Sequence, residues 1–264
     1  MINTGSVDNM AVKVLVIAFL FLSLFGLNTG LYKIHHYVSD KMTSTYAQLY
    51  CQTYYSDLST VSNEDLKLLS NNPQVTEDYY WIGLFRDSQN PSVWRWSGGE
   101  QATDVKWDNG QPEEKNENCA VVQKSSAKVH DVDCSWTTSF YCMEVFQLIL
   151  VQQESTWEEA LGYCRQNYYE FATLSSDLMM AQAKQESKSA LTDDVWIGLR
   201  FLAGSWFWVN GEAFEYKAWS SKGDLQCPAM NQRCGVYNVK KQNWKPADCE
   251  QRLNFLCVEK LKNL

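Results

Sequence analysis

The chain has 264 residues, of which 45% are apolar and 20% are charged, a composition too apolar for an intrinsically disordered protein. Acidic residues outnumber basic ones by 31 to 23, which gives a net charge of −8 at pH 7. Because nucleic-acid binding needs a basic stripe, this balance argues against a nucleic-acid partner. Nine cysteines without a Cys-x-x-Cys pair indicate an oxidising compartment rather than a zinc site.

The first 30 residues predict an export signal. Val14–Leu27 form an apolar run that follows Lys13. A bilayer span needs about 20 residues, whereas the core of a signal peptide needs about 7–15. We therefore expect a cleaved signal peptide over residues 1–30 and a secreted protein. The alternative is an uncleaved signal-anchor, which would make a single-pass membrane protein with the rest of the chain outside.

The remainder of the chain contains an internal repeat. Trp81-Ile82-Gly83-Leu84 recurs 115 residues later as Trp196-Ile197-Gly198-Leu199, and eight of the nine cysteines fall into two matching sets of four. The repeat predicts two tandem domains, which we place at residues 36–145 and 146–260. The join near Val145–Gln147 is too short to be a flexible linker.

Each unit is expected to begin with a short strand and two helices. In the second unit Leu148–Val151 form the strand, and Thr156 with Glu159 makes a capping box at the first helix. The first helix of each unit ends near the first cysteine. We place the second helices at Asn63–Leu69 and Leu178–Lys188, because small polar residues precede both. These capping residues are Ser62 in the first unit and Ser175 or Ser176 in the second.

Short aromatic and β-branched runs follow the helices. Trp94-Arg95-Trp96 and Trp206-Phe207-Trp208 each place two indole rings on one face of a strand, because side chains alternate along strands. Gly98-Gly99 and Asn210-Gly211 then close turns. We therefore predict an α+β fold for each unit, with two helices, short antiparallel strands and disulfide bonds.

These motifs resemble the C-type lectin-like domain in both units, over about residues 36–259. The shared features are a helix that ends in cysteine, the WIGL strand, the Trp-x-Trp hairpin and the cysteine spacing of the C-terminal half. Spacing alone leaves three connectivities for four cysteines. The resemblance implies that the first and last cysteines of each unit pair, as do the middle two: Cys51–Cys142, Cys119–Cys134, Cys164–Cys257 and Cys234–Cys249.

The resemblance also implies a calcium site in the first unit. Sugar-binding members of the family hold calcium with a Glu-Pro-Asn or Gln-Pro-Asp triplet whose proline is cis, an acidic residue two before the second cysteine, and an Asn-Asp pair. The same side chains bind the sugar hydroxyls, and calcium itself takes six to eight oxygens. The corresponding calcium ligands are Gln111, Glu113, Glu117 and Asp131, and the corresponding sugar contacts are Gln111, Glu113, Glu117 and His130.

The first unit departs from this family pattern at two positions. Glu113 stands where the family has Asp, and His130 stands where it has Asn, although a hard cation does not favour a nitrogen ligand. The order of Gln111-Pro112-Glu113 resembles the galactose-type triplet more than the mannose-type. The alternative is a solvated acidic loop in a domain that has lost its calcium.

The second unit lacks the calcium ligands. Its triplet position reads Cys227-Pro228-Ala229, Gln232 replaces the acidic residue before Cys234, and Lys245-Pro246 replaces the Asn-Asp pair. We therefore expect no calcium in the second unit. Cys227 is the ninth cysteine, and it predicts either a disulfide-linked dimer or a buried free thiol.

These features predict an extracellular carbohydrate-binding protein whose first domain alone binds sugar through calcium. Its partners would be glycans or glycoproteins. The alternative is a lectin-like receptor or secreted recognition protein that binds proteins without calcium. We expect no enzymatic activity, because the chain has no G-x-S-x-G or H-E-x-x-H motif and only three histidines.

Overall fold

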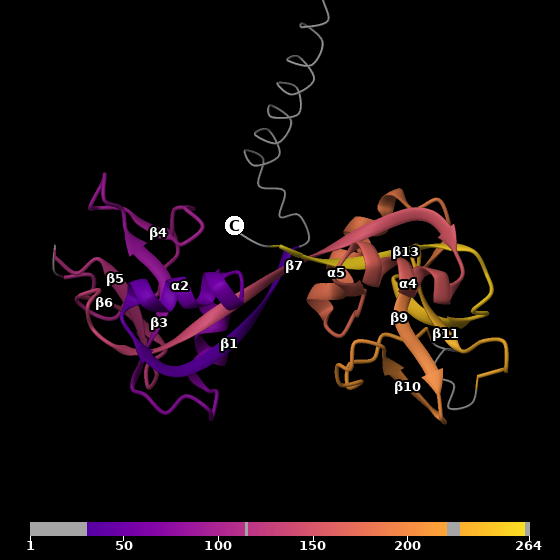
Figure 1. The fold of residues 1–264 in the computed structure, drawn as a ribbon, viewed down its shortest axis with the longest axis horizontal. Helices are drawn as coiled ribbons and strands as arrows, with labels where there is room; N and C mark the ends of the chain where they lie inside the picture. The colour runs from indigo at the N-terminus through magenta and orange to yellow at the C-terminus, as the bar shows by residue number, and fades with distance from the viewer. Residues whose placement is uncertain (1–30, 114–115, 221–227, 262–264) are drawn as a thin grey trace, which may run out of the picture.

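The computed structural model describes residues 31–113, 116–220 and 228–261. They form two lobes joined by a narrow, twisted ribbon of strands (Figure 1). The predicted signal segment Val14–Leu27 and the ninth cysteine, Cys227, lie outside the described residues. Within the described residues, no helix is both long and apolar enough to cross a membrane.

The two lobes repeat one order of elements, and each contains two α-helices. The first lobe contains β1 (Leu31–Met42), α2 (Ser44–Tyr54), β2 (Asp57–Leu58), α3 (Asn63–Ser70), β3 (Tyr79–Arg86), β4 (Trp94–Trp96), β5 (Cys119–Gln123) and β6 (Lys128–Val132). The second contains α4 (Trp157–Asn167), β8 (Glu170–Phe171), α5 (Asp177–Glu186), the 3₁₀ turn Ser187–Ser189, β9 (Asp194–Leu202), β10 (Ser205–Trp208), β11 (Cys234–Asn238), β12 (Asn243–Ala247) and β13 (Leu253–Leu261). The predicted α+β fold is therefore confirmed.

One long strand, β7 (Thr138–Ser155), belongs to both lobes. Its first part pairs antiparallel with β1, and its second part pairs antiparallel with β13. Val145–Gln147 are paired on both sides, with Leu31–Lys33 of β1 and with Glu259–Leu261 of β13. The join between the domains is therefore the centre of a three-stranded ribbon.

The other strands of each lobe extend the same hydrogen-bonded sheet beyond the ribbon. In the first domain β5 pairs with β3 and β6, and β4 pairs with β3; in the second, β11 pairs with β9 and β12, and β10 pairs with β9. β3 meets β7 in parallel, and β9 meets β13 in the same way.

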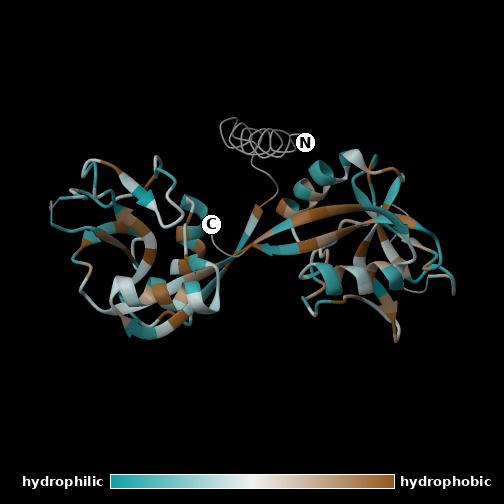
Figure 2. Cartoon of the chain, turned by 45° about the horizontal axis from the view of Figure 1, so that its top comes forward, coloured by the Kyte–Doolittle hydropathy of each residue, from teal (hydrophilic) through white to brown (hydrophobic). Residues whose placement is uncertain are grey.

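Hydrophobic residues are concentrated along the strands (Figure 2), and most of them are buried and form the cores. Trp81 and Trp196 are fully buried, and their indole N–H groups donate to the carbonyls of Met42 and Ser155, each at 2.9 Å. Each WIGL strand is thereby tied to the strand that opens its own domain. Gly83 is required in this strand, because a Cβ there would lie 2.8 Å from the carbonyl oxygen of Leu58.

The predicted capping residues are confirmed, although α5 begins at Asp177 rather than at the predicted Leu178. Thr156 and Glu159 form a capping box at α4, Ser62 begins α3 in the same way, and Ser176 caps α5. α5 ends at Glu186 rather than at the predicted Lys188, because the chain tightens there into a 3₁₀ turn. The four disulfides are those that the resemblance implied: Cys51–Cys142, Cys119–Cys134, Cys164–Cys257 and Cys234–Cys249.

Candidate ligand-binding site in the first domain

The Gln-Pro-Glu triplet folds back onto β6 at Asp131. The Gln111–Pro112 peptide bond is cis. The backbone N–H of Glu113 donates to Oδ1 of Asp131, and the backbone N–H of Asp131 donates to Oε1 of Gln111, each at 3.2 Å. Three of the four predicted calcium ligands, Gln111, Glu113 and Asp131, therefore lie together. They are hydrogen-bonded to one another and not arranged around an empty space.

The guanidinium of Arg86, at the end of β3, binds the other oxygen of the same carboxylate. Its Nη2 lies 3.0 Å from Oδ2 of Asp131, and the two side chains are only 10% and 0% exposed. Nε and Nη1 donate to the carbonyls of Glu117 and Pro91, each at 3.0 Å. The planar guanidinium also lies over the ring of Trp94, 4.6 Å from its centroid. Arg86 thus joins β6 to two loops.

The other two predicted site residues occupy different positions. Glu117 contributes its backbone carbonyl to Arg86. His130 belongs to the opposite face of β6 from Asp131, because neighbouring side chains alternate. Its Nε2 lies 3.2 Å from Oδ2 of Asp108, and its ring meets the edge of Tyr79.

Asp108 also binds the ammonium of Lys128. The ammonium of Lys128 lies 2.7 Å from Oδ1 of Asp108, and this hydrogen bond is the main cause that lowers the pKa of the carboxyl. His130 therefore contacts an ionised carboxylate rather than the triplet.

This arrangement does not fit a calcium ion. Both oxygens of Asp131 accept hydrogen bonds, from Arg86 and from Glu113, and the amide oxygen of Gln111 accepts another. Calcium requires such oxygens to point at the ion. Among the described residues, no three acidic, histidine or cysteine side chains are grouped so that they could hold a metal. Calcium ligation remains a prediction that requires Arg86 to leave Asp131.

A cavity of about 780 Å³ opens beside the triplet. Trp94 and Trp107 form part of its apolar wall, with their ring centroids 4.8 Å apart. Arg86, Pro112 and Glu113 contribute to another part of the wall. Apolar surface with a few polar groups at its edge is typical of small-molecule sites. The chemistry suits a ligand with both C–H faces and hydroxyl groups.

Arg86 was not among the site residues expected from the sequence. Its partner Asp131 is 45 residues away, so local spacing gives no indication of the pair. The internal repeat carries a signal, because Phe201 and Pro246 stand 115 residues after Arg86 and Asp131. Both members of the ion pair are thus absent from the second domain. There Lys245 binds Asp194 instead, at 2.6 Å.

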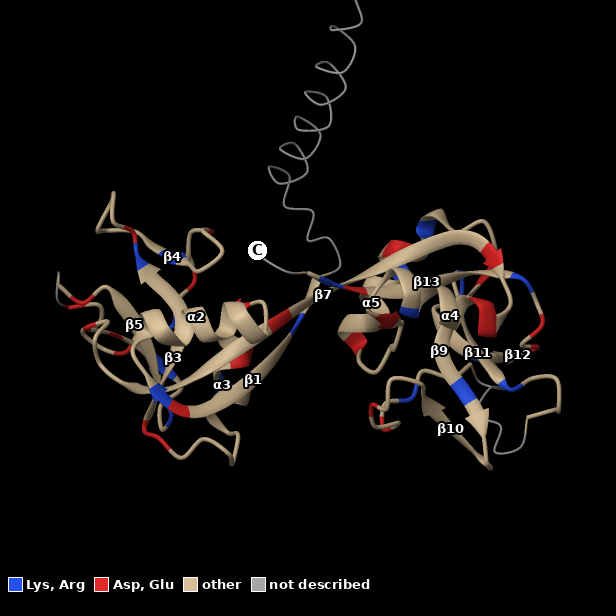
Figure 3. Cartoon of the chain, in the orientation of Figure 1, with Lys and Arg blue, Asp and Glu red and all other residues tan. Residues whose placement is uncertain are grey.

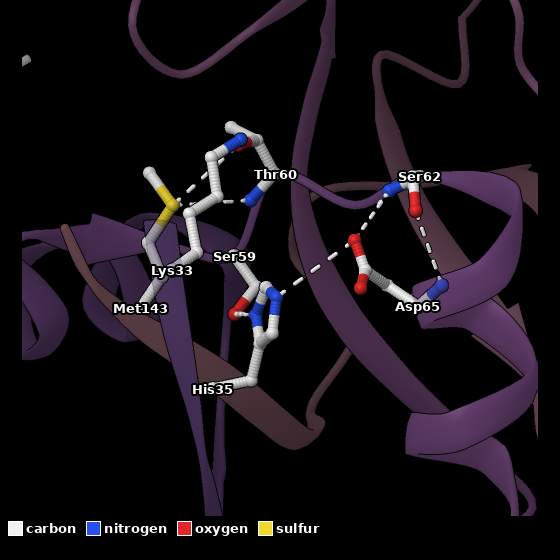
Figure 4. Close-up of polar contacts among 7 residues, drawn as sticks. All are labelled: Lys33, His35, Ser59, Thr60, Ser62, Asp65 and Met143. Atoms are coloured by element: carbon white, nitrogen blue, oxygen red, sulfur yellow. Dashed lines mark hydrogen bonds and ion pairs between the residues drawn. The ribbon is translucent and has the colours of Figure 1, made fainter. Parts of the chain in front are cut away.

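A separate polar cluster lies between β1 and α3 (Figure 4). Nδ1 of His35 lies 2.9 Å from Oγ of Ser59, and Nε2 lies 3.9 Å from Oδ2 of Asp65. The ammonium of Lys33 donates to the hydroxyl of Thr60. Ser59 is fully buried and Asp65 caps α3, so the order Asp–His–Ser here offers no accessible nucleophile. Burial lowers the pKa values of both Lys33 and His35.

Comparison with known proteins places this geometry in a family. Residues 40–144 and 153–259 both match the Lectin C-type domain family. The chain belongs to this family. Its two lectin domains are homologous to proteins described as lectins and receptors.

Three curated relatives illustrate the range of similarity. C-type mannose receptor 2 of Homo sapiens is 24% identical over 80% of this chain, Rheacalcin-1 of Rhea americana is 32% identical over 40%, and Lectin BRA-3 of Megabalanus rosa is 28% identical over 48%. The matches cover 18%, 82% and 72% of those proteins respectively. This lectin chain thus spans about a fifth of the mannose receptor.

Among solved structures, the mouse scavenger receptor C-type lectin carbohydrate-recognition domain is 25% identical. The match covers 42% of this chain and 88% of that domain, with a TM-score of 0.39. The coverage corresponds to one of the two lectin domains.

Proposed function

We propose that the chain is an extracellular recognition protein that binds glycans or glycoproteins through the long-loop face of its first domain. The observation that carries this proposal is the cavity of about 780 Å³ beside Gln111–Glu113, where sugar-binding relatives carry their triplet. The four disulfides support an extracellular location, because such bonds persist in oxidising compartments. The proposal assigns no catalytic residue.

In this proposal, glycan binding by the first domain does not require calcium. Calcium-dependent binding through Gln111, Glu113, Glu117 and Asp131 would require the buried Arg86–Asp131 pair to separate. Separating this pair would take the guanidinium away from the carboxylate and from the two loop carbonyls that it binds. The calcium-free form keeps every contact as it stands. Both galactose-type and mannose-type glycans serve as probes, because the order of amide and acid in the triplet selects between them only around a calcium ion.

In this proposal the second domain is a scaffold for the first domain. It has Pro246 at the position of Asp131, and its three-residue match to the triplet ends in Ala229 rather than Glu. We assign it no calcium and no sugar. A disulfide-linked dimer through Cys227 would add avidity, because two weak sites on one molecule bind an array of glycans more tightly.

The exposed Glu113 side chain offers a test that preserves the fold. Glu113→Ala keeps the backbone N–H that binds Asp131 and removes a carboxylate from the cavity wall. We expect glycan binding to weaken about tenfold or more, since hydrogen bonds to charged groups contribute about 1.5–3 kcal/mol. A glycan array followed by titration of the best ligand measures this.

The second domain supplies the matched control. Ala229→Glu places the same carboxylate at the corresponding position of that domain, and we expect no change in binding. The absence of glycan binding by the natural chain, or unchanged binding by Glu113→Ala, would contradict the proposal.

A protein ligand is the second candidate, because α2 carries an unusual surface. The helix has no charged residue, and Tyr46, Leu49 and Tyr54 are 66%, 58% and 65% exposed. Exposed apolar groups of this kind favour a protein partner. Enzymatic removal of glycans from a bound glycoprotein separates the candidates: binding that survives favours α2, and binding that is lost favours the cavity.

A further inference from the structure

We propose that the guanidinium of Arg86, at the end of β3, takes the place of a metal cation beside Asp131 of β6, so that the first domain does not respond to calcium. The inference rests on the calcium-free form of the proposed function and assigns its cause to one residue. It concerns the two residues of the buried ion pair, Arg86 and Asp131.

Arg86 binds the same types of oxygen atom that would bind a metal cation between loops. Its three nitrogens donate to the carboxylate of Asp131 and to the carbonyls of Pro91 and Glu117, all at 3.0 Å. Carboxylate and carbonyl oxygens are also what calcium gathers. A guanidinium offers five N–H donors in a fixed plane and stays charged in proteins, so it can bind several such oxygens at once.

The second domain behaves as an internal comparison. Arg86 lies opposite Trp94 in the β3–β4 pair, and Phe201 lies opposite Trp206 in the β9–β10 pair. Phe201 packs against the Trp206 ring, with centroids 5.4 Å apart, where the guanidinium of Arg86 covers Trp94.

The partner position changes in the same way. Asp131 lies opposite Ala120 between β5 and β6, and Pro246 lies opposite Gly235 between β11 and β12. The chain thus carries the pair in one domain and neither member in the other. This is expected if each residue is needed by the other, because an unpaired buried charge is costly.

The pair also excludes calcium by repulsion. An ion at Asp131 would lie beside the guanidinium that already binds the same carboxylate, whose side chain is fully buried. Like charges repel more strongly there than in water. The oxygens of Asp131 are therefore committed to a cation that the chain itself provides.

Calcium titration of the natural chain tests the inference without any glycan. Calorimetry with millimolar calcium chloride should give no saturable heat, and the melting temperature should be the same in calcium chloride and in a chelator. Saturable uptake of calcium that Asp131→Asn abolishes would overturn the inference. This experiment needs no variant that depends on Arg86, so it holds even if such variants fail to fold.

A double-mutant cycle tests the pairing itself. Arg86→Met and Asp131→Asn should each lower the melting temperature, and the double variant should be no less stable than the weaker single variant, because neither charge is then left unpaired. Additive losses would overturn the inference. Since both experiments lack glycans, failure of the proposed glycan binding would leave their results unchanged, and the reverse also holds.

Discussion

His35 is buried in its neutral form at neutral pH. The side chain is 10% exposed, and burial is the main cause that lowers its pKa from 6.5 to about 4. The carboxylate of Asp65 opposes this shift, while the charges of Lys33 and His36 add to it. Figure 4 shows His35 between Ser59 and Asp65, with Lys33 nearby. In mild acid, the His35 imidazole is therefore protonated in the unfolded chain but remains neutral in the folded chain.

This shift predicts a loss of stability in mild acid. Because the pKa is lower in the folded state, the contribution of His35 is fully present above pH 6.5 and is lost as the pH falls toward about 4. We expect about 2 kcal/mol of unfolding free energy to be lost between pH 7 and pH 5 through this residue. Urea unfolding at both pH values measures the loss. His35→Gln should remove it, and an equal pH dependence in both proteins would contradict this account.

At the residue scale, the sequence identified one side of the site and missed the other. The resemblance to the lectin-like domain implied Gln111, Glu113 and Asp131 as site residues, and the structure brings these three together. It could not identify Arg86, because a guanidinium partner can come from any distant segment. It also grouped His130 with the triplet, although strand pleating turns His130 toward Asp108.

At the scale of elements, the first helices of the two domains, α2 and α4, differ in how they are capped. α4 begins with Thr156, whose side chain accepts from the backbone N–H of Glu159. α2 begins with Thr43, which makes no such bond, and Tyr46 cannot complete a capping box. The same residue type therefore caps one helix and not its counterpart.

This difference gives a prediction with an internal control. Thr156→Ala should lower the unfolding free energy by about 1 kcal/mol, because it removes a side-chain cap. Thr43→Ala should change it by a few tenths of a kcal/mol, since no cap bond is lost there. Urea unfolding compares the two variants, and equal losses would contradict the role assigned to the Thr156 side chain.

Sequence patterns predicted the elements but not their continuity. The capping boxes and the Trp-x-Trp strands follow from local residue types. The strand predicted at Leu148–Val151 is part of an 18-residue strand that begins at Thr138. The fusion depends instead on pairing with β1 and β13, which are far apart in the sequence.

At the scale of the whole molecule, the shared strand β7 couples the domains. Contacts beyond the ribbon add to this coupling: the hydroxyl of Ser56 donates to the carbonyl of Leu261, and the amide of Gln182 donates to that of Leu31. Tyr32 of β1 stacks on Phe146 within the core of the second domain.

Lys and Arg are interspersed with Asp and Glu in both lobes (Figure 3).

We therefore expect the two domains to align as one body in solution. Residual dipolar couplings from both should fit a single alignment tensor. A Gly-Ser-Gly insertion between Phe146 and Gln147 should break the ribbon and give two tensors. The same insertion between Lys240 and Lys241, in the turn between β11 and β12, is the control. Two tensors in the natural chain would contradict rigid coupling.

The internal repeat indicated the tandem architecture, because identical motifs recur at a fixed spacing. It could not indicate how the domains are arranged, since that depends on pairing between β1, β7 and β13, which are far apart in the sequence. Only the short join near Val145–Gln147 pointed to a stiff connection.

The central claim is that the first domain recognises glycans or glycoproteins without calcium. The most direct measurement is a glycan array probed with the natural chain in calcium chloride and again in a chelator. We expect the same glycans to bind with the same signal in both conditions. Binding that disappears in the chelator would contradict it.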